Sequence, residues 1–385
     1  MRGKWTGRIF WPVALAAALN AASPLPGEAL RPTADSWPVF RGDNGLTGAA
    51  IARFPARPAL RWSFATGDQV KSSPVVGNGR VFIGSSDGKV YCLELATGRK
   101  VWERETGSSV EAPPLLDQGS LYVGTLAGSV IRLDAATGAP RWTFEAGGRV
   151  AGSANLFRGG ATGKATVLVG CYDGNLYALD AETGRSLWTR HTESYINGAP
   201  AVTGNLAVFG GCDARLHVVS AIDGAEIAAV DTGAYIPGSP AVSGGKAFVG
   251  NYGDALLCVE LATGAIAWTY RNDRQAGGFF SSPALAAGAL VIGSRDGRVH
   301  CVDPRTGILR WVYDAGAEVD SAPVIAGDEV AFGTGSGRLV ILALNDGGER
   351  WSFEVGGGIS GSPAVVAGTV LVGSDDGRIY AFGDR

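Results

Sequence analysis

Four polar residues at one position of a repeated segment are the first candidates for binding chemistry. Lys71, Glu111, Asn197 and Asp320 each stand three residues before a proline that recurs along the chain. An ammonium, two carboxylates and an amide offer both donors and acceptors, so together they could hold a polar ligand. The alternative is a solvated rim whose charges pair between neighbouring copies. In the other copies the same position, here called the ring position, is taken by Ala151, Pro237, Phe280 and Ser360.

One segment departs from the repeat just before its sixth copy. It begins with Arg271 and Arg274, runs through two glycines and ends with Phe279 and Phe280. Arginine and aromatic side chains are typical anchors of protein interfaces, so we expect this loop to contact a ligand or partner. The alternative is a tolerated surface insertion whose aromatic residues belong to the core. Tyrosines precede the ring position in two adjacent copies, Tyr195 and Tyr235. The other insertion, residues 157–164, is interpreted as plain loop growth on the opposite face.

Other reactive residues do not form a known catalytic or metal-binding motif. No pair of His and Cys has the spacing of a zinc site, and we expect no metal. The five cysteines cannot all pair. Cys171 and Cys212 are interpreted as equivalent positions of adjacent copies, and a disulfide between them stays open. The others are expected in the core: Cys92, Cys258 and Cys301.

These residues are positioned by an internal repeat of about 40 residues. A Trp recurs near a Thr-Gly pair at successive spacings of 40, 40, 46, 40, 40, 43 and 40, with Ala228 in one slot. Within each copy, short apolar runs are separated by turns such as Asp87-Gly88 and Asp376-Gly377. Asp-Gly between apolar runs is a strong hairpin signal. The tryptophans are Trp62, Trp102, Trp142, Trp188, Trp268, Trp311 and Trp351.

Four antiparallel strands in 40 to 45 residues match one propeller blade. The last copy ends before its Trp strand, whereas the first Trp strand, residues 60–64, stands alone at the other end. Pairing these two ends removes unpaired strand edges. We therefore predict an all-β, eight-bladed β-propeller of four-stranded antiparallel blades, closed by the N-terminal strand, which completes the last blade.

The segment at residues 176–188, Leu-Tyr-Ala-Leu-Asp-Ala-Glu-Thr-Gly-Arg-Ser-Leu-Trp, resembles the tryptophan-docking repeat of quinoprotein alcohol dehydrogenase-like propellers. BamB-like and other secreted PQQ-like repeat proteins share it, and residues 37–42 resemble the lead-in of secreted members. The resemblance implies that the seven tryptophans pack between blades as a structural girdle.

The resemblance leaves the activity open. Quinoprotein dehydrogenases hold pyrroloquinoline quinone (PQQ) under a disulfide of adjacent cysteines beside Ca²⁺, and this chain has no adjacent cysteines. BamB-like members are interaction platforms. We expect a non-enzymatic scaffold with envelope or secreted protein partners and no cofactor. The alternatives are a PQQ-binding dehydrogenase and a small-ligand sensor that uses the channel mouth.

The N-terminus predicts export. Basic residues precede an apolar run at residues 9–19, which is too short to span a bilayer. We predict a signal peptide at residues 1–29 (an uncleaved anchor being the alternative), an N-terminal extension at residues 30–59 and one propeller domain at residues 60–385. The expected location is periplasmic or extracellular, without a transmembrane span after cleavage. A net charge of −3 argues against nucleic-acid binding, and we expect a monomer.

Overall fold

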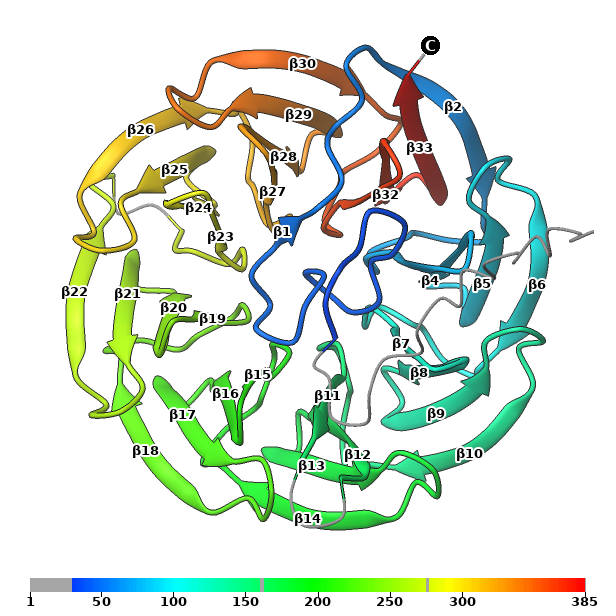
Figure 1. Ribbon diagram of the computed structural model, residues 1–385, viewed down its shortest axis with the longest axis vertical. Helices are drawn as coiled ribbons and strands as arrows, with labels where there is room; N and C mark the ends of the chain where they lie inside the picture. The colour runs from blue at the N-terminus through cyan, green and yellow to red at the C-terminus, as the bar shows by residue number, and fades with distance from the viewer. Residues whose placement is uncertain (1–29, 160–162, 275–276, 385) are drawn as a thin grey trace, which may run out of the picture.

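The computed structural model describes residues 30–159, 163–274 and 277–384, and the predicted signal peptide lies outside them. Within these residues the chain forms an eight-bladed β-propeller, as predicted (Figure 1). Each blade is an antiparallel sheet whose strands, from the channel outward, are here called A to D. Among the described residues, none forms a helix with the length and apolarity needed to cross a membrane.

The strand bounds repeat closely from blade to blade. Blades 1 to 4 consist of β3 (Val75–Gly77), β4 (Arg80–Gly84), β5 (Lys89–Glu94), β6 (Lys100–Glu105); β7 (Leu115–Asp117), β8 (Ser120–Gly124), β9 (Ser129–Asp134), β10 (Pro140–Glu145); β11 (Asn155–Arg158), β12 (Ala165–Gly170), β13 (Asn175–Asp180), β14 (Ser186–His191); β15 (Ala201–Thr203), β16 (Leu206–Gly210), β17 (Arg215–Ser220), β18 (Glu226–Asp231).

The second half of the ring continues the same pattern. Blades 5 to 8 consist of β19 (Ala241–Ser243), β20 (Lys246–Gly250), β21 (Ala255–Glu260), β22 (Ile266–Arg271); β23 (Ala284–Ala286), β24 (Ala289–Gly293), β25 (Arg298–Val302), β26 (Leu309–Asp314); β27 (Val324–Ala326), β28 (Glu329–Gly333), β29 (Arg338–Ala343), β30 (Glu349–Glu354); β31 (Ala364–Val366), β32 (Thr369–Ser374), β33 (Arg378–Asp384), β2 (Pro58–Ala65).

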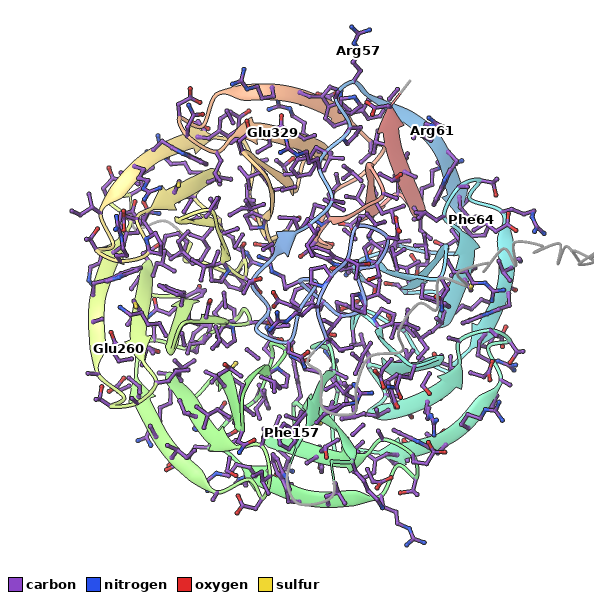
Figure 2. All side chains as sticks on the ribbon, in the orientation of Figure 1. Arg57, Arg61, Phe64, Phe157, Glu260 and Glu329 are labelled. Atoms are coloured by element: carbon purple, nitrogen blue, oxygen red, sulfur yellow. The ribbon has the colours of Figure 1, made fainter. Side chains whose placement is uncertain are left out.

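The closure of the ring is confirmed. Strand β2 pairs antiparallel with β33 and becomes strand D of blade 8, with Trp62 opposite Ala381. The two ends of the propeller are therefore held by one shared sheet, and both edges that an open array would expose are covered. Figure 2 shows Arg57 and Arg61 at the outer rim beside this seam.

Seven tryptophans lie between neighbouring blades. The indole nitrogen of Trp102 donates to the Ala135 carbonyl of the next blade at 3.1 Å, and its ring lies against Gly138 there. The same indole–glycine contact links successive blades along most of the ring. At the slot without Trp, a β-carbon on Gly264 would meet only Ala228 and Val230, each at 3.5 Å. At the junctions with Trp the glycine thus serves two purposes, because it makes the C–D turn and leaves room for the neighbour's indole.

A glycine at the end of strand B admits an apolar side chain from the next blade. A β-carbon on Gly84 would stand 2.3 Å from Val110, and one on Gly250 would stand 2.5 Å from Phe279. Side chains such as Phe157 fill the spaces between blades (Figure 2). The core is therefore divided among the junctions between blades rather than placed at the centre.

The N-terminal segment at residues 30–54, here called the plug, crosses the centre of the ring (Figure 1). Strand β1 (Ala49–Ala50) adds to β27 in parallel. The plug also bonds the innermost strand region of every blade. Its backbone partners are Val76 for Trp37, Leu116 for Pro38, Val202 for Asn44, Val242 for Gly45, Leu285 for Thr47, Ile325 for Gly48 and Ala367 for Ala34, while the Asn44 side chain reaches Leu156.

Arg41 is the polar centre of the plug. Its guanidinium is completely buried and donates to the carbonyls of Pro283, at 2.9 Å, and Pro323. These carbonyls belong to neighbouring blades, 6 and 7. Desolvation lowers the pKa of Arg41 to about 9, which leaves the guanidinium protonated at neutral pH. The sequence predicted only an extension here, because the contacts that define the plug join residues far apart in the chain.

Candidate functional site

All eight residues at the ring position line one cavity at the channel. The cavity has a volume of about 180 Å³, and the plug residue Phe40 lies in its wall. By strand order, the B–C turns and the D–A loops share one face of the propeller, here called the ring face; the A–B and C–D turns share the opposite one, here called the plug face. The ring residues sit in the D–A loops. Because the plug crosses the channel on the A–B side, the cavity opens on the ring face.

The D–A loops are held by the residue that precedes each ring residue. Val70, before Lys71, packs onto Gly373 of the previous blade, and Val110, before Glu111, packs onto Gly84. Serines two residues after the ring position add hydrogen bonds between blades, since the Ser362 amide donates to the Ser73 hydroxyl at 2.8 Å. The polar ring side chains therefore project from a fixed backbone.

The four polar ring residues all have protein partners. Lys71 Nζ lies 3.6 Å from Glu111 Oε1 in the next blade, and both side chains are partly exposed. Asn197 donates to the Pro237 carbonyl at 2.6 Å. Asp320 accepts three hydrogen bonds from Arg295, at 2.8, 3.2 and 2.7 Å. Of these contacts, the Lys71–Glu111 pair is of the kind that the alternative raised from the sequence describes.

A set of aromatic side chains on the ring face includes Phe280 of this inner ring and extends beyond it. Tyr235 and Tyr252 stack with ring centroids 4.4 Å apart, and Tyr252 meets Phe280 edge-on at 5.5 Å. Tyr172 and Tyr195 form a second stack, with centroids 5.3 Å apart. The guanidinium of Arg295 lies 3.4 Å from the Phe280 ring centroid. We call this set the aromatic arc: Tyr172, Tyr195, Tyr235, Tyr252, Phe280 and Arg295.

The arc combines exposure with rigidity. Tyr195, Tyr235 and Tyr252 are 55%, 38% and 45% exposed. The backbone beneath them is fixed, because the Tyr252 amide donates to the Tyr235 carbonyl at 3.0 Å. Desolvation and the hydrogen bond with Tyr252 raise the pKa of Tyr235, so its phenol stays neutral at physiological pH. The arc thus presents uncharged aromatic surface beside one fixed cation.

Half of the arc was missed by the sequence analysis. Tyr172, Tyr252 and Arg295 occupy one position of the B–C turn, and their amides bond the D–A loop residues Arg149, Tyr235 and Gly278. The missed signal was a second position that varies from copy to copy just before the Asp-Gly turn. It is held elsewhere by Ser86, Leu126, Cys212, Gly335 and Asp375.

The candidate residues of the sixth-copy loop lie in different environments. Arg271 and Arg274 are exposed, but neither belongs to the residues lining the channel cavity. Phe279, which we expected to contact a ligand, is instead a core residue with no exposed surface. It fills the position held by Val110 in blade 2, against the strand-B glycine of the previous blade. Only Phe280 reaches the channel.

The interpretation of the two rim cysteines as equivalent needs correction. Cys171 follows Gly170 as Gly211 follows Gly210, so Cys212 corresponds to Tyr172 instead. All five cysteines are free thiols. Cys171 contacts the Gly148 carbonyl at 3.1 Å and is buried, whereas Cys212 is partly exposed. The cysteines at positions 92, 258 and 301 lie in the core, as expected.

The described residues offer little for a metal or a quinone. They contain no group of three His, Cys, Asp or Glu side chains that could hold a metal ion. PQQ is a tricyclic tricarboxylate and needs a pocket of ordinary size. Ligand pockets usually measure about 300–1,000 Å³, whereas the channel cavity measures only about 180 Å³. The one cation among the ring residues, Lys71, is already paired with Glu111. The residues that line the channel cavity do not fit PQQ.

Comparisons with known proteins agree with this architecture. The sequence profile of a family described as outer membrane protein assembly factor BamB matches residues 6–209, 150–226 and 212–385. A search of curated protein sequences returned no match.

Solved structures show the same fold at low sequence identity. BamB from Moraxella catarrhalis superposes with a TM-score of 0.71 at 21% identity, over 85% of this chain and 98% of that one. Quinohemoprotein alcohol dehydrogenase from Comamonas testosteroni superposes with a TM-score of 0.75 at 15% identity, over 90% of this chain and 80% of that one. A europium-containing methanol dehydrogenase superposes with a TM-score of 0.76 at 13% identity, over 91% of this chain and 98% of that one. The fold is thus shared by BamB and by dehydrogenases.

Proposed function

The chain belongs to the family of the outer membrane protein assembly factor BamB, and from that premise we propose that it is a non-enzymatic scaffold that binds protein partners of the cell envelope. The proposed docking surface is the aromatic arc on the ring face. The observation that carries the proposal is the stack of two exposed tyrosines, Tyr235 and Tyr252, beside the Arg295–Asp320 pair.

Physical chemistry favours a protein as the occupant of this surface. Tyrosine and arginine are enriched among the residues that dominate binding energies. Tyrosine buries a large area at a low cost in side-chain entropy, and the guanidinium of arginine stacks on aromatic rings. The stacking of Tyr172 on Tyr195 and of Tyr235 on Tyr252 orders these rings before a partner arrives. Preorganised side chains lose less freedom on binding, so more of the contact energy appears as affinity.

Affinity capture from an envelope extract tests the proposal. The immobilised wild-type protein should retain specific partners, and the double variant Tyr235→Ala, Tyr252→Ala should lose them. The control variant Leu187→Ala, Ile227→Ala removes two equally exposed side chains, 53% and 52%, from the outer rim. It should retain the partners. If the tyrosine variant captures the same proteins as wild type, the arc is not the docking surface.

We propose further that the protein acts without a cofactor. The volume and charge of the channel cavity support this, since a tricarboxylate would meet Glu111 and Asp320 as well as Lys71. Titration of the purified protein with PQQ, with and without Ca²⁺, should give no absorbance change and no binding heat. Saturable binding would revive the dehydrogenase alternative.

We propose finally that the protein is exported. The basic and apolar N-terminus supports a signal peptide at residues 1–29 and a periplasmic or extracellular location. N-terminal sequencing of the protein recovered from the periplasm or medium should begin near residue 30, and light scattering should give the mass of a monomer. An N-terminus at residue 1 in a membrane fraction would instead support an uncleaved anchor.

A further inference from the structure

A groove on the plug face lies beside the junction of blades 2 and 3, away from the aromatic arc. It has two adjoining cavities of about 580 and 550 Å³, which share Asp117, Gln118 and Arg158 in their walls. Both volumes fall in the range of about 300–1,000 Å³ that is usual for small-molecule sites. The insertion after Phe157, expected to be plain loop growth, contributes Arg158, Gly163 and Lys164 to the groove.

A buried ion pair stands between the two cavities. Arg158 donates to Asp117 Oδ2 at 2.6 Å, and the two side chains are only 10% and 8% exposed. This contact uses one guanidinium nitrogen and one carboxylate oxygen. A buried ion pair is costly to desolvate and gives little net stability, so its position between two cavities points to a role in binding.

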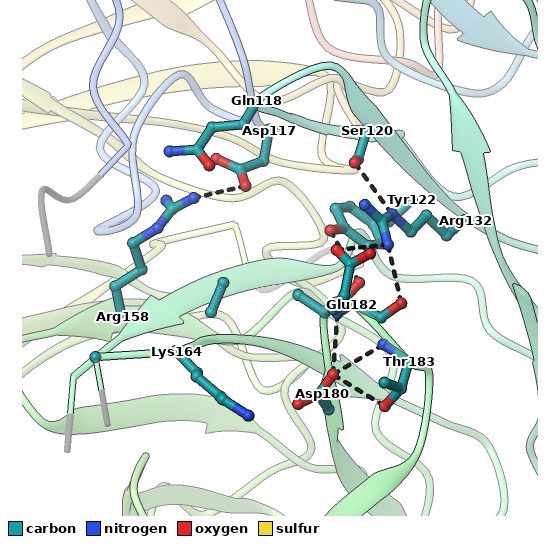
Figure 3. A pocket seen from close by; sticks show the side chains of 13 residues that line it. Asp117, Gln118, Ser120, Tyr122, Arg132, Arg158, Lys164, Asp180, Glu182 and Thr183 are labelled. Carbon is teal, nitrogen blue, oxygen red and sulfur yellow. Dashed lines mark hydrogen bonds and ion pairs between the residues drawn. The ribbon is translucent and has the colours of Figure 1, made fainter. Parts of the chain in front are cut away.

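The first cavity is polar and electrically balanced (Figure 3). Three cations and three carboxylates line it. Arg132 donates to the Ser120 hydroxyl at 3.1 Å and to the Glu182 carbonyl at 2.9 Å, which ties blade 2 to blade 3. A free anion or a free cation would therefore meet as many repelling as attracting groups. The six charged residues are Arg132, Arg158, Lys164, Asp117, Asp180 and Glu182.

The second cavity adds apolar surface. Its walls include Leu30 and Pro38 of the plug and Leu116 of β7, together with Thr33 and one further cation, Arg31. Arg31 is exposed, so solvent and salt screen its charge, and the charges nearer the ion pair remain balanced. A ligand that fits both cavities needs hydroxyl groups that donate and accept, C–H faces that can cover apolar surface, and no net charge. Sugar rings have all three properties.

We propose that this groove binds a short, neutral oligosaccharide. Its hydroxyls would bridge guanidinium donors and carboxylate acceptors in the first cavity, because one hydroxyl can donate to Asp117 and accept from Arg158 at once. The C–H face of a second ring would cover Leu30 and Leu116 in the other cavity. The two cavities on either side of the ion pair suit a chain of two or three sugars.

Calorimetric titration with neutral trisaccharides tests the proposal on the full mature chain. Maltotriose, cellotriose and xylotriose are the probes, while trigalacturonate and triglycine represent an anion and a zwitterion of similar length. At least one neutral trisaccharide should bind. If none binds at millimolar concentrations, or if only trigalacturonate or triglycine binds, the proposal is overturned.

Two variants locate the binding. Arg132→Gln should weaken the affinity about tenfold, as expected for a lost hydrogen bond from a charged group, and Lys164→Gln removes a second cation from the same wall. The matched control is Arg80→Gln, because Arg80 makes the same kind of contact, to the Ala136 carbonyl at 2.9 Å, at the junction of blades 1 and 2. It should bind like wild type.

Thermal melting of each variant keeps the test decisive. If Arg132→Gln melts much earlier than wild type, the Lys164→Gln result stands in its place. Unchanged affinity in a folded variant of either residue would place the sugar elsewhere and overturn the assignment of the groove. Capture of proteins by the aromatic arc should be unaffected by these variants, so the two proposals fail independently.

Discussion

The indole ring of Trp142 lies directly against Gly184 of the next blade, where a β-carbon on the glycine would stand 2.6 Å from Trp142 Cδ2. Gly184 also has a φ of +73°. One glycine therefore satisfies two conditions, since it makes the C–D turn and leaves room for the neighbouring indole.

Gly184→Ala should destabilise the protein by about 2–4 kcal/mol, because left-handed backbone strain and overpacking against the indole add together. The control is Gly204→Ala, at a φ of +54° with no atom within 4 Å of the added carbon. Gly204→Ala should lower the free energy of unfolding only by the cost of left-handed backbone strain, about 1–2 kcal/mol. Chemical denaturation compares the two, and equal losses would show that the indole contact contributes nothing.

Arg41→Lys should loosen the plug. An ammonium cannot reproduce the planar fork that reaches the carbonyls of Pro283 and Pro323 together. We expect a loss of about 2–3 kcal/mol in the free energy of unfolding, as for a lost hydrogen bond from a buried charged group. Arg57→Lys is the control, because Arg57 points away from the propeller (Figure 2). Equal denaturation midpoints for both variants would contradict the role of the plug.

The hydrogen bond from Tyr177 to Asp173 should make stability depend on pH in both directions. Burial and this hydrogen bond raise the pKa of Tyr177. Burial acts to raise the pKa of Asp173, but hydrogen bonds from Tyr177 and the Asn175 amide outweigh it and lower that pKa. A raised tyrosine pKa stabilises the fold below about pH 10, and a lowered aspartate pKa stabilises it above about pH 4.

Tyr177→Phe should therefore lower the free energy of unfolding between about pH 4 and pH 10 by about 1 kcal/mol. It should also weaken the loss of stability below and above that range. The melting temperature measured from pH 3 to pH 11 checks this. A variant curve parallel to that of wild type would mean that the pair does not titrate as the structure indicates.

The five thiols should differ in reactivity. Desolvation raises the pKa of Cys92, Cys171 and Cys258 to about 11 and of Cys301 to about 12, and burial keeps reagents from these thiols. Desolvation also raises the pKa of Cys212, but this thiol is partly exposed and therefore accessible. Maleimide should label Cys212 alone in the native protein and all five after denaturation, with or without prior reduction. Fewer than five labels without reduction would reveal a disulfide.

A fluorophore on Cys212 offers a further readout. Its amide donates to the Tyr195 carbonyl at 2.9 Å, so the label would sit within the aromatic arc. Binding of an envelope partner should change its fluorescence, whereas a trisaccharide in the plug-face groove should not.

The sequence by itself determined the propeller, its eight blades and its closure. Each blade is a local unit of hairpins, and its turns and its Trp recur within about 40 residues, so the period alone reveals the register. It also placed the eight ring residues, because equal positions in equal blades must meet at the channel.

Tertiary structure decided how these units meet. Phe279 and Phe280 are neighbours in the chain, yet one is core and the other faces the channel, because only Phe279 lies over Gly250 of the previous blade. The aromatic arc joins B–C turns to D–A loops, and the plug bonds residues up to several hundred positions away. Such contacts follow from ring closure and side-chain packing, which no local repeat encodes.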